Sequence, residues 1–157
     1  MKAKNPGIGA KEISTPVVTC GVTNGLSIIG YLFADEIDKV ICPDLYWENY
    51  DLVFTNAYGA KLQFFNLFKN GLFDIAAFEK ALDKGYKGKK IVLLNFPNNP
   101  SGYTPTREAA DGIIKALKEA AEKGNQLVVI LDDSYFGLVF EDEITTESLF
   151  AELSGIH

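Results

Sequence analysis

Two polar segments of the sequence contain side chains that could bind one ligand together. The first is NFPNNPSG at 95–102, and the second is LDDSY at 131–135. Asn99 offers a hydrogen-bond donor and an acceptor, Asp132 offers a carboxylate, and Tyr135 offers a hydroxyl. These groups suit a polar ligand that carries a positive charge or hydrogen-bonding atoms.

The adjacent carboxylates Asp132 and Asp133 have three roles open to them. Successive side chains of a strand point to opposite faces, so we expect the two carboxylates to diverge and one of them to face the ligand. That carboxylate could bind Mg²⁺, pair with a cationic atom of the ligand, or cap the turn that follows. The residue types alone do not decide between these roles.

A run of branched apolar residues precedes each polar segment. The runs are Ile91–Leu94 and Leu127–Ile130. Apolar runs that lack alternation and end at turn residues are typical of strands buried on both faces. Ligands of open α/β sheets bind at the carboxyl ends of such strands. The sequence therefore predicts that both polar segments face one crevice.

Two further features could contribute to a ligand site. The small residues Gly21–Gly25 form a predicted turn before a helix, where free backbone N–H groups and the helix dipole favour an anion such as phosphate. From these residues alone a plain strand–helix connection is the favoured interpretation, because the glycine and lysine spacing of the known phosphate loops is missing. Trp47 either packs in the core or stacks on a planar ligand.

Strands and helices alternate along the whole sequence. We expect strands at 16–20, 39–42, 61–65, 91–94 and 127–130. We expect helices at 26–33, at 46–58, after an Asp74 cap, from a Thr104 or Thr106 cap to Lys123, and at 147–153. This alternation predicts an α/β fold, with a largely parallel sheet and helices on both faces.

Composition narrows the classes of function. The net charge of −6 argues against nucleic acid and anionic membranes as partners. No apolar run reaches the roughly 18 residues of a membrane span, and the first fifteen residues lack a secretory signal, so the expected location is the cytoplasm. Cys20 and Cys42 are expected to be buried free thiols. The single histidine, His157, excludes a zinc constellation and a Ser-His-Asp triad.

A short basic run precedes the apolar segment at 91–94. It contains Lys87, Lys89 and Lys90 in the sequence GYKGKK. A solvated turn before a strand is the favoured interpretation of this run, and a phosphate-binding patch is the alternative.

Taken together, these motifs resemble a known family. Asn99–Gly102, Asp132–Tyr135 and, after Pro43, Trp47–Tyr50 occur in the order found in the class I/II aminotransferases. These enzymes use pyridoxal 5′-phosphate (PLP) and have the aspartate-aminotransferase fold, known as fold type I. The resemblance covers roughly residues 16 to 150, and it implies that the ligand of the site is the cofactor PLP.

The resemblance implies a role for each residue of the site. The residues that it assigns to the cofactor are Gly21, Val22, Thr23, Trp47, Asn99, Asp132 and Tyr135. The backbone of the first three would bind the phosphate, and the tryptophan would stack on the pyridine ring. The asparagine and the tyrosine would bond the phenolic oxygen, and the aspartate would pair with the protonated ring nitrogen.

The sequence also departs from the family pattern. No lysine follows Lys123, there is no Ser-x-x-Lys segment for the Schiff-base lysine, and Arg107 is the only arginine. We therefore expect an irregular N-terminal arm at 1–15 and a partial PLP-binding large domain at 16–157, which lacks the C-terminal part and the small domain. Such a fragment would be inactive alone and would contain no catalytic residue of its own.

The resemblance implies a parent enzyme that transfers an amino group between an amino acid and a 2-oxo acid and that forms a homo-oligomer such as a dimer. Two alternatives share the same motifs: a non-catalytic aminotransferase-like domain of a transcription regulator, and another fold type I activity such as a lyase. A Mg²⁺-dependent phosphoryl-transfer domain that uses Asp132 and Asp133 is a third alternative.

Overall fold

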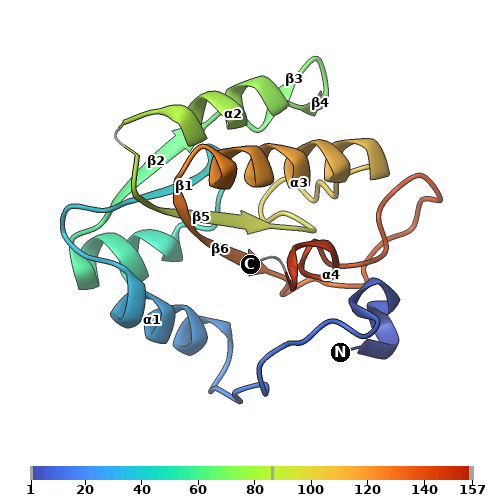
Figure 1. Cartoon of the computed structure of the whole chain (residues 1–157), viewed down its shortest axis with the longest axis horizontal. Helices are drawn as coiled ribbons and strands as arrows, with labels where there is room; N and C mark the ends of the chain where they lie inside the picture. Colours follow the sequence, from blue (N-terminus) through green and yellow to red (C-terminus); the bar gives the residue numbers. More distant parts are fainter. Residues whose placement is uncertain (1, 86, 156–157) are drawn as a thin grey trace.

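The computed structural model describes residues 2–85 and 87–155, so Met1, Tyr86 and the last two residues of the predicted 16–157 segment lie outside the description. Four parallel strands form the central sheet in the order β2-β1-β5-β6 (Figure 1). Their bounds are β1 Lys39–Pro43, β2 Lys61–Phe65, β5 Lys89–Asn95 and β6 Gln126–Asp132. The predicted parallel α/β sheet is confirmed, and four of the five expected strands are present.

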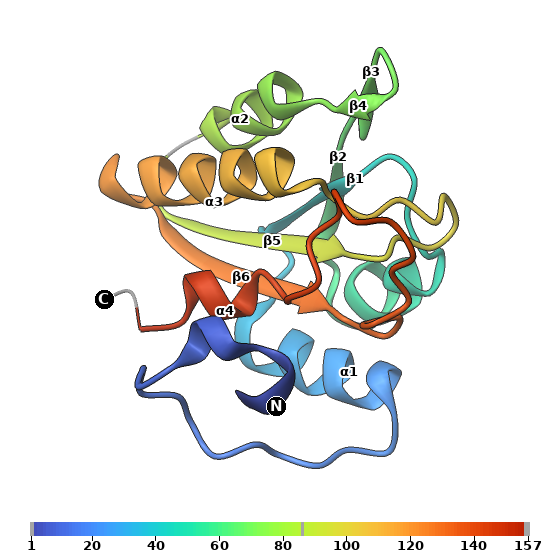
Figure 2. The same ribbon diagram turned by 90° about the vertical axis from the view of Figure 1, so that its right-hand side faces the viewer.

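Helices cover both faces of this sheet, as predicted. Figure 2 shows α2 and α3 on one face and α1 on the other, where η3 packs beside α1. The helices are α1 Val22–Phe33, the π-helix η3 Asp51–Asn56, α2 Ile75–Asp83, α3 Arg107–Glu122 and α4 Phe150–Leu153, with short 3₁₀ helices η1 Lys2–Lys4 and η2 Pro6–Ile8. The arm at 1–15 thus contains two helical turns, and η2 packs against α4.

The alternation of side chains along β5 builds the two cores. Ile91 and Leu93 pack with α1 and η3, whereas Val92 and Leu94 pack with α2 and α3. All four side chains are at most 1% exposed, because both faces of the strand are covered. This double burial explains why the strand is an uninterrupted apolar run in the sequence.

Helix starts agree with the predicted caps. The Asp74 side chain accepts a hydrogen bond from the N–H of Ala77 at 2.9 Å. Thr106, one of the two threonines proposed, accepts from the N–H of Ala109 at 3.2 Å and begins α3. Each bond satisfies one of the N–H groups that the first turn of a helix leaves without a partner.

The predicted strand at 16–20 is wrong. The segment is an extended chain that joins no sheet in the described part of the protein, and Figure 2 shows it passing outside α1, on the side away from the sheet. Val17 and Val18 are 83% and 95% exposed. Cys20 is also exposed, contrary to prediction, whereas Cys42 is buried as predicted, and both are free thiols. An apolar run forms a strand only where a neighbouring strand satisfies its backbone groups.

Two predicted boundaries also shift. The predicted turn at 21–25 is reduced to Gly21, because α1 already begins at Val22. The last helix begins at Phe150 rather than at Glu147. The Glu147 carboxylate accepts from the N–H of Gly7, and the Ser148 hydroxyl accepts from the N–H of Phe150, so this segment bonds to the arm and to the first residue of α4.

A hairpin that the sequence analysis did not predict extends beyond β2. It consists of the antiparallel strands β3 Phe68–Lys69 and β4 Leu72–Phe73. Asn70 and Gly71 connect them with φ angles of 54° and 80°. Asn-Gly is the pair that a tight hairpin turn with two positive φ angles requires, so the signal was present in the sequence. The hairpin brings Phe73 into the core.

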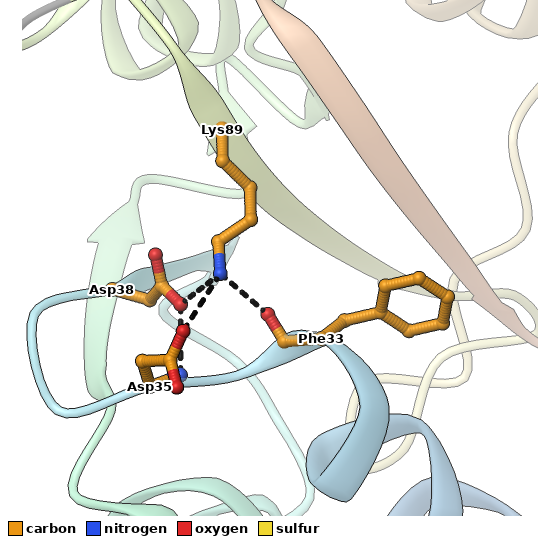
Figure 3. Close-up of polar contacts among 4 residues, drawn as sticks. All are labelled: Phe33, Asp35, Asp38 and Lys89. Carbon is orange, nitrogen blue, oxygen red and sulfur yellow. Dashed lines mark hydrogen bonds and ion pairs between the residues drawn. The ribbon is translucent and has the colours of Figure 1, made fainter.

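The basic run at 87–90 is a solvated turn before a strand, as predicted, only at Lys87, which is exposed. Lys89 and Lys90 are the first residues of β5. The Lys89 ammonium contacts the carboxylates of Asp38 at 2.7 Å and Asp35 at 3.2 Å, and it donates to the carbonyl oxygen of Phe33 at 2.9 Å (Figure 3). Lys90, on the other face, is only 7% exposed. Lys89 therefore ties α1 to the sheet on one face, and Lys90 lies buried on the other.

None of the helices in residues 2–85 and 87–155 combines the length and the apolar character that crossing a bilayer requires.

Candidate functional site

The chain order of the strands creates a crevice at the carboxyl edge of the sheet. From β1 the chain passes to β2 on one side and then to β5 on the other side of β1. Such a change of direction leaves the connections diverging, and ligands of open α/β sheets bind at this point. A hollow of about 230 Å³ opens at this edge. It is lined by Val22, Trp47, Asn95, Asn99, Asp132, Ser134 and Tyr135.

The structure gathers most of the predicted site residues around this hollow. Val22, Trp47, Asn99, Asp132 and Tyr135 all line it, although they come from four separate segments of the chain. The other two predicted residues, at 21 and 23, flank the first of these at the start of α1 and are not in the lining. The two polar segments therefore face one crevice, as predicted.

The amino end of α1 supplies backbone donors at the rim of the hollow. Gly21 is the N-cap with a φ of 87°, a conformation that favours glycine, and no side chain among residues 2–85 and 87–155 caps the helix. The first N–H groups of a helix lack intrahelical acceptors, and the helix dipole makes this end positive. An uncapped helix start of this kind favours an anionic group of a ligand.

Asp132 is held in one orientation by three donors. Its Oδ2 accepts from the Tyr50 hydroxyl at 2.6 Å. Its Oδ1 accepts from both the N–H and the hydroxyl of Ser134. Asp132 is 4% exposed and Tyr50 is 1% exposed, so neither carboxylate nor phenol is free to turn toward water. The carboxylate is thus fixed at the edge of the hollow.

Tyr50 remains a hydrogen-bond donor over the ordinary pH range. Burial, the hydrogen bond to Asp132 and the charge of that carboxylate all hold the pKa of Tyr50 far above its usual value. From the sequence we expect Tyr50 on a helix, with no role of its own in the site. The contact joins residues 82 positions apart, and nothing local in the sequence signals it.

Asn95 connects the ends of β5 and β6. Its side-chain N–H donates to the backbone oxygen of Asp132 at 2.7 Å, and its side-chain oxygen accepts from the N–H of Asn99 at 2.7 Å. The residue is 3% exposed. It was missed in the sequence analysis, although a polar residue that ends a buried apolar strand is a detectable signal. Its two bonds set the position of Asn99 relative to β6.

The connection that carries Trp47 is tied to the same loop. Asn98 donates from its side chain to the carbonyl oxygen of Leu45 at 3.1 Å. The Trp47 ring lies edge-on to the ring of Tyr50, with centroids 5.7 Å apart. Trp47 packs against the core that contains Tyr50, as one of its two predicted roles requires, and it also lines the hollow.

Asp133 points away from this site, so the two carboxylates diverge as predicted. It lines a separate small cavity with Leu94 and Ser148. Burial raises the pKa of Asp133, a hydrogen bond from Ser148 lowers it, and the nearby charge of Asp132 raises it. The two carboxylates do not converge on one point, and residues 2–85 and 87–155 contain no group of three or more acidic, histidine or cysteine side chains suited to a metal ion.

An open parallel sheet with an indole, an amide, a carboxylate and a phenol around one hollow defines an α/β domain with a ligand site at its carboxyl edge. The family model described as "Aminotransferase class I and II" matches residues 1–155. The chain belongs to this family, and the resemblance found from the sequence is confirmed. Membership of the family implies PLP as the cofactor.

Individual relatives agree with this assignment. A probable aspartate aminotransferase of Methanocaldococcus jannaschii is 29% identical over 125 residues, which are 80% of this chain and 31% of that protein. A probable aspartate/prephenate aminotransferase of Rickettsia felis is 32% identical over 124 residues, or 76% of this chain and 29% of that protein. The crystal structure of an aminotransferase from Anaerococcus prevotii has a TM-score of 0.81 and 27% identity, and it covers 98% of this chain and 39% of that one. The chain thus spans about a third of these relatives.

Proposed function

We propose that this chain forms the cofactor-binding part of a PLP-dependent aminotransferase, an enzyme that transfers an amino group between an amino acid and a 2-oxo acid. The observation that carries the proposal is the convergence of Trp47, Asn99, Asp132 and Tyr135 on one hollow beside the start of α1. PLP is a flat ring with a phosphate, a basic ring nitrogen and a phenolic oxygen, and the groups around the hollow include a partner for each of these features.

The start of α1 suits the phosphate. Gly21, Val22 and Thr23 form the N-cap and the start of the first turn of a helix that no described side chain caps. Their position allows backbone N–H groups and the helix dipole to bind a dianion. Because Val22 also lines the hollow, the phosphate and the ring would occupy one continuous site.

Asp132 suits the ring nitrogen. Tyr50 and Ser134 hold its carboxylate at the edge of the hollow, so no rearrangement is needed to meet a positive atom. A bound PLP supplies an electron sink for carbanion chemistry at the α-carbon of an amino acid. The task of Asp132 is to keep the proton on the pyridine nitrogen, through a charge-assisted hydrogen bond that contributes about 1.5–3 kcal/mol.

The remaining groups fix the plane and the rotation of the ring. The Trp47 indole offers a flat apolar face for stacking and covers the ring from water. Asn99 can donate to the phenolic oxygen from its amide, and Tyr135 from its hydroxyl. The bonds of Asn95 place Asn99 before any ligand arrives.

The described lining of the hollow contains no lysine, and the resemblance implies a lysine for covalent attachment of PLP. We therefore propose that the 157-residue chain binds the cofactor but has no aminotransferase turnover. Measurable amino transfer by the purified chain would contradict this part of the proposal.

Trp47, the only tryptophan, provides a direct test of cofactor binding. Pyridoxamine 5′-phosphate is the better probe, because its amine cannot form imines with surface lysines as the PLP aldehyde does. We expect saturable quenching of Trp47 fluorescence. Asp132→Asn should weaken binding by about tenfold, since a charge-assisted bond is lost. The matched control, Asp133→Asn, should leave the affinity unchanged.

Two outcomes would refute the proposed site. The first is the absence of saturable quenching in a chain shown to be folded by circular dichroism. The second is an equal loss of affinity in the Asp132→Asn and Asp133→Asn variants, which would mean that neither carboxylate has a specific role toward the ring.

We also propose that the protein is cytoplasmic and assembles with copies of itself. The free thiols of Cys20 and Cys42 support a reducing compartment. Tyr31 and Leu32 of α1 are 76% and 61% exposed, and large exposed apolar side chains favour association. Sedimentation velocity tests the second point, and a monomer across a wide concentration range would contradict it.

A further inference from the structure

A second hollow lies at the opposite, amino edge of the sheet, where β1 and β5 begin. Its volume is about 60 Å³. Its lining includes Lys39, Ile41, Gln63, Lys84, Lys89 and Lys90. Four lysines thus belong to the lining of one small hollow, in a chain with a net charge of −6. None of these residues lines the candidate cofactor site.

Lys90 is the buried member of the group, with an exposed fraction of 7%. Its ammonium donates to the carbonyl oxygen of Lys84 at 3.0 Å, just after the end of α2. An ammonium has three donors. Across residues 2–85 and 87–155, this carbonyl is the one hydrogen-bond acceptor that the structure gives it. Support for the end of α2 therefore accounts for one donor of Lys90 and leaves further capacity toward the hollow.

The charges around Lys90 do not balance. Burial and the positive charge of Lys39 lower the pKa of Lys90, and the charge of Asp83 raises it. However, the carboxylate of Asp83 bonds to Lys123 of α3 at 3.1 Å. A buried cation is costly unless an anion pairs with it.

Lys89 does not add a free charge to the hollow. Its ammonium is engaged by Asp35, Asp38 and the carbonyl oxygen of Phe33 on the α1 face (Figure 3). Lys39, Lys84 and Lys90 are the cations that remain toward the α2 face. Gln63 is anchored there, because its side-chain N–H donates to the carbonyl oxygen of Ala81 at 3.1 Å.

We propose that this hollow is a binding site for a phosphate group, held by the ammonium groups of Lys90, Lys39 and Lys84. A space of about 60 Å³ holds a few water molecules, which matches a compact oxyanion rather than a cofactor ring. A dianion would neutralise the excess charge on the lysines and supply the missing acceptors of Lys90. The proposal is independent of the proposed aminotransferase function, since the two sites lie at opposite edges of the sheet.

Residue-resolved NMR of the 157-residue chain tests this site. Inorganic phosphate is titrated against chloride at constant ionic strength, and glycerol 3-phosphate in a second arm distinguishes a phosphate ester from the free ion. We expect saturable shifts of the amide signals of Lys39, Gly85 and Lys90. Lys90→Met and Lys39→Met should each weaken binding by about tenfold, because each removes a charge-assisted bond. Lys69→Met, on the exposed β3 strand, is the charge-matched control and should change nothing.

The design separates loss of the site from loss of the fold and from binding elsewhere. Lys90→Met also removes a bond at the end of α2, whereas Lys39 is exposed, so its variant tests the site without that complication. Shifts confined to the amides at 21–23 would assign phosphate binding to α1 and overturn the proposal. Unchanged affinity in both the Lys39→Met and the Lys90→Met variant would overturn it as well.

Discussion

Replacing Tyr50 by phenylalanine removes a single oxygen from the buried support of the candidate site. In the native chain the Tyr50 hydroxyl donates to Asp132 at 2.6 Å, and the two residues are 1% and 4% exposed. The variant keeps the ring and its edge-on contact with Trp47. It leaves one carboxylate oxygen without its donor in a place that water reaches poorly. The change therefore isolates the hydrogen bond.

The expected loss follows from the charge and burial of this bond. A hydrogen bond to a charged group contributes about 1.5–3 kcal/mol to stability. For a domain of this size each kcal/mol corresponds to a shift of about 2–4 °C in the unfolding midpoint, so Tyr50→Phe should lower it by about 3–12 °C. Affinity for pyridoxamine 5′-phosphate should fall too, because Asp132 is no longer held in place.

Tyr46 provides a matched control. Its hydroxyl donates to Asp51 at the same distance, 2.6 Å, but both residues are half-buried rather than buried. Water can replace the lost donor, so Tyr46→Phe should cost less than about 1 kcal/mol. Thermal unfolding of the native chain and both variants, followed by circular dichroism, makes the comparison. Equal losses in the two variants, or none in Tyr50→Phe, would show that burial does not strengthen the Tyr50 bond.

The same two tyrosines predict how stability depends on alkaline pH. The hydrogen bond to Asp51, followed by burial, raises the pKa of Tyr46 to about 12, and burial first and then Asp132 raise the pKa of Tyr50 further. A phenol with a raised pKa in the folded state stabilises the fold fully below its unfolded value of about 10 and loses this contribution as the pH rises. Urea midpoints above about pH 10 should therefore fall less in Tyr50→Phe than in the native chain.

Three further predictions concern other parts of the molecule. A thiol reagent should label exposed Cys20 in the native chain and Cys42 only after unfolding, since Cys42 is buried and burial raises its pKa to about 12. Mass spectrometry locates the label, and labelling of Cys42 in the native chain would contradict this prediction. Asp133→Asn should raise the urea midpoint at about pH 7, because burial raises the pKa of Asp133 and disfavours its charged form. The gain in midpoint should shrink toward acid pH, and a gain that does not change with pH would contradict a role for the Asp133 charge. Gly30→Ala should destabilise the fold by about 1–2 kcal/mol, since the added methyl would lie 2.5 Å from the Tyr58 ring; a more stable variant in urea unfolding would contradict this.

The sequence predicted the parts of the fold that local patterns determine. The buried strand at 91–94 is a run of branched residues, and Asp74 caps a helix whose apolar spacing is regular, so both are recognisable without tertiary information. The segment at 16–20 has a similar composition, but the described part of the protein offers it no neighbouring strand. The composition of a segment indicates its preference for the extended conformation, whereas strand formation also requires a neighbouring strand, which the local sequence does not identify.

The site shows the same division. Asn99 and Asp132 were predicted because they follow buried strands, and strand ends meet at one edge. Tyr50 and Lys90 were not, because their roles depend on contacts across the fold: one reaches a residue 82 positions away, and the other is covered by the end of α2. A tyrosine on a helix and a lysine in a basic run give no local sign of burial.

The two bonds of Asn95 have a consequence for the energetics of recognition. They join the tips of two neighbouring strands and the loop between them before any ligand is present. A ligand then meets groups whose conformational freedom was already lost when the chain folded. Little ordering entropy remains to oppose association, so more of each contact is expressed as affinity.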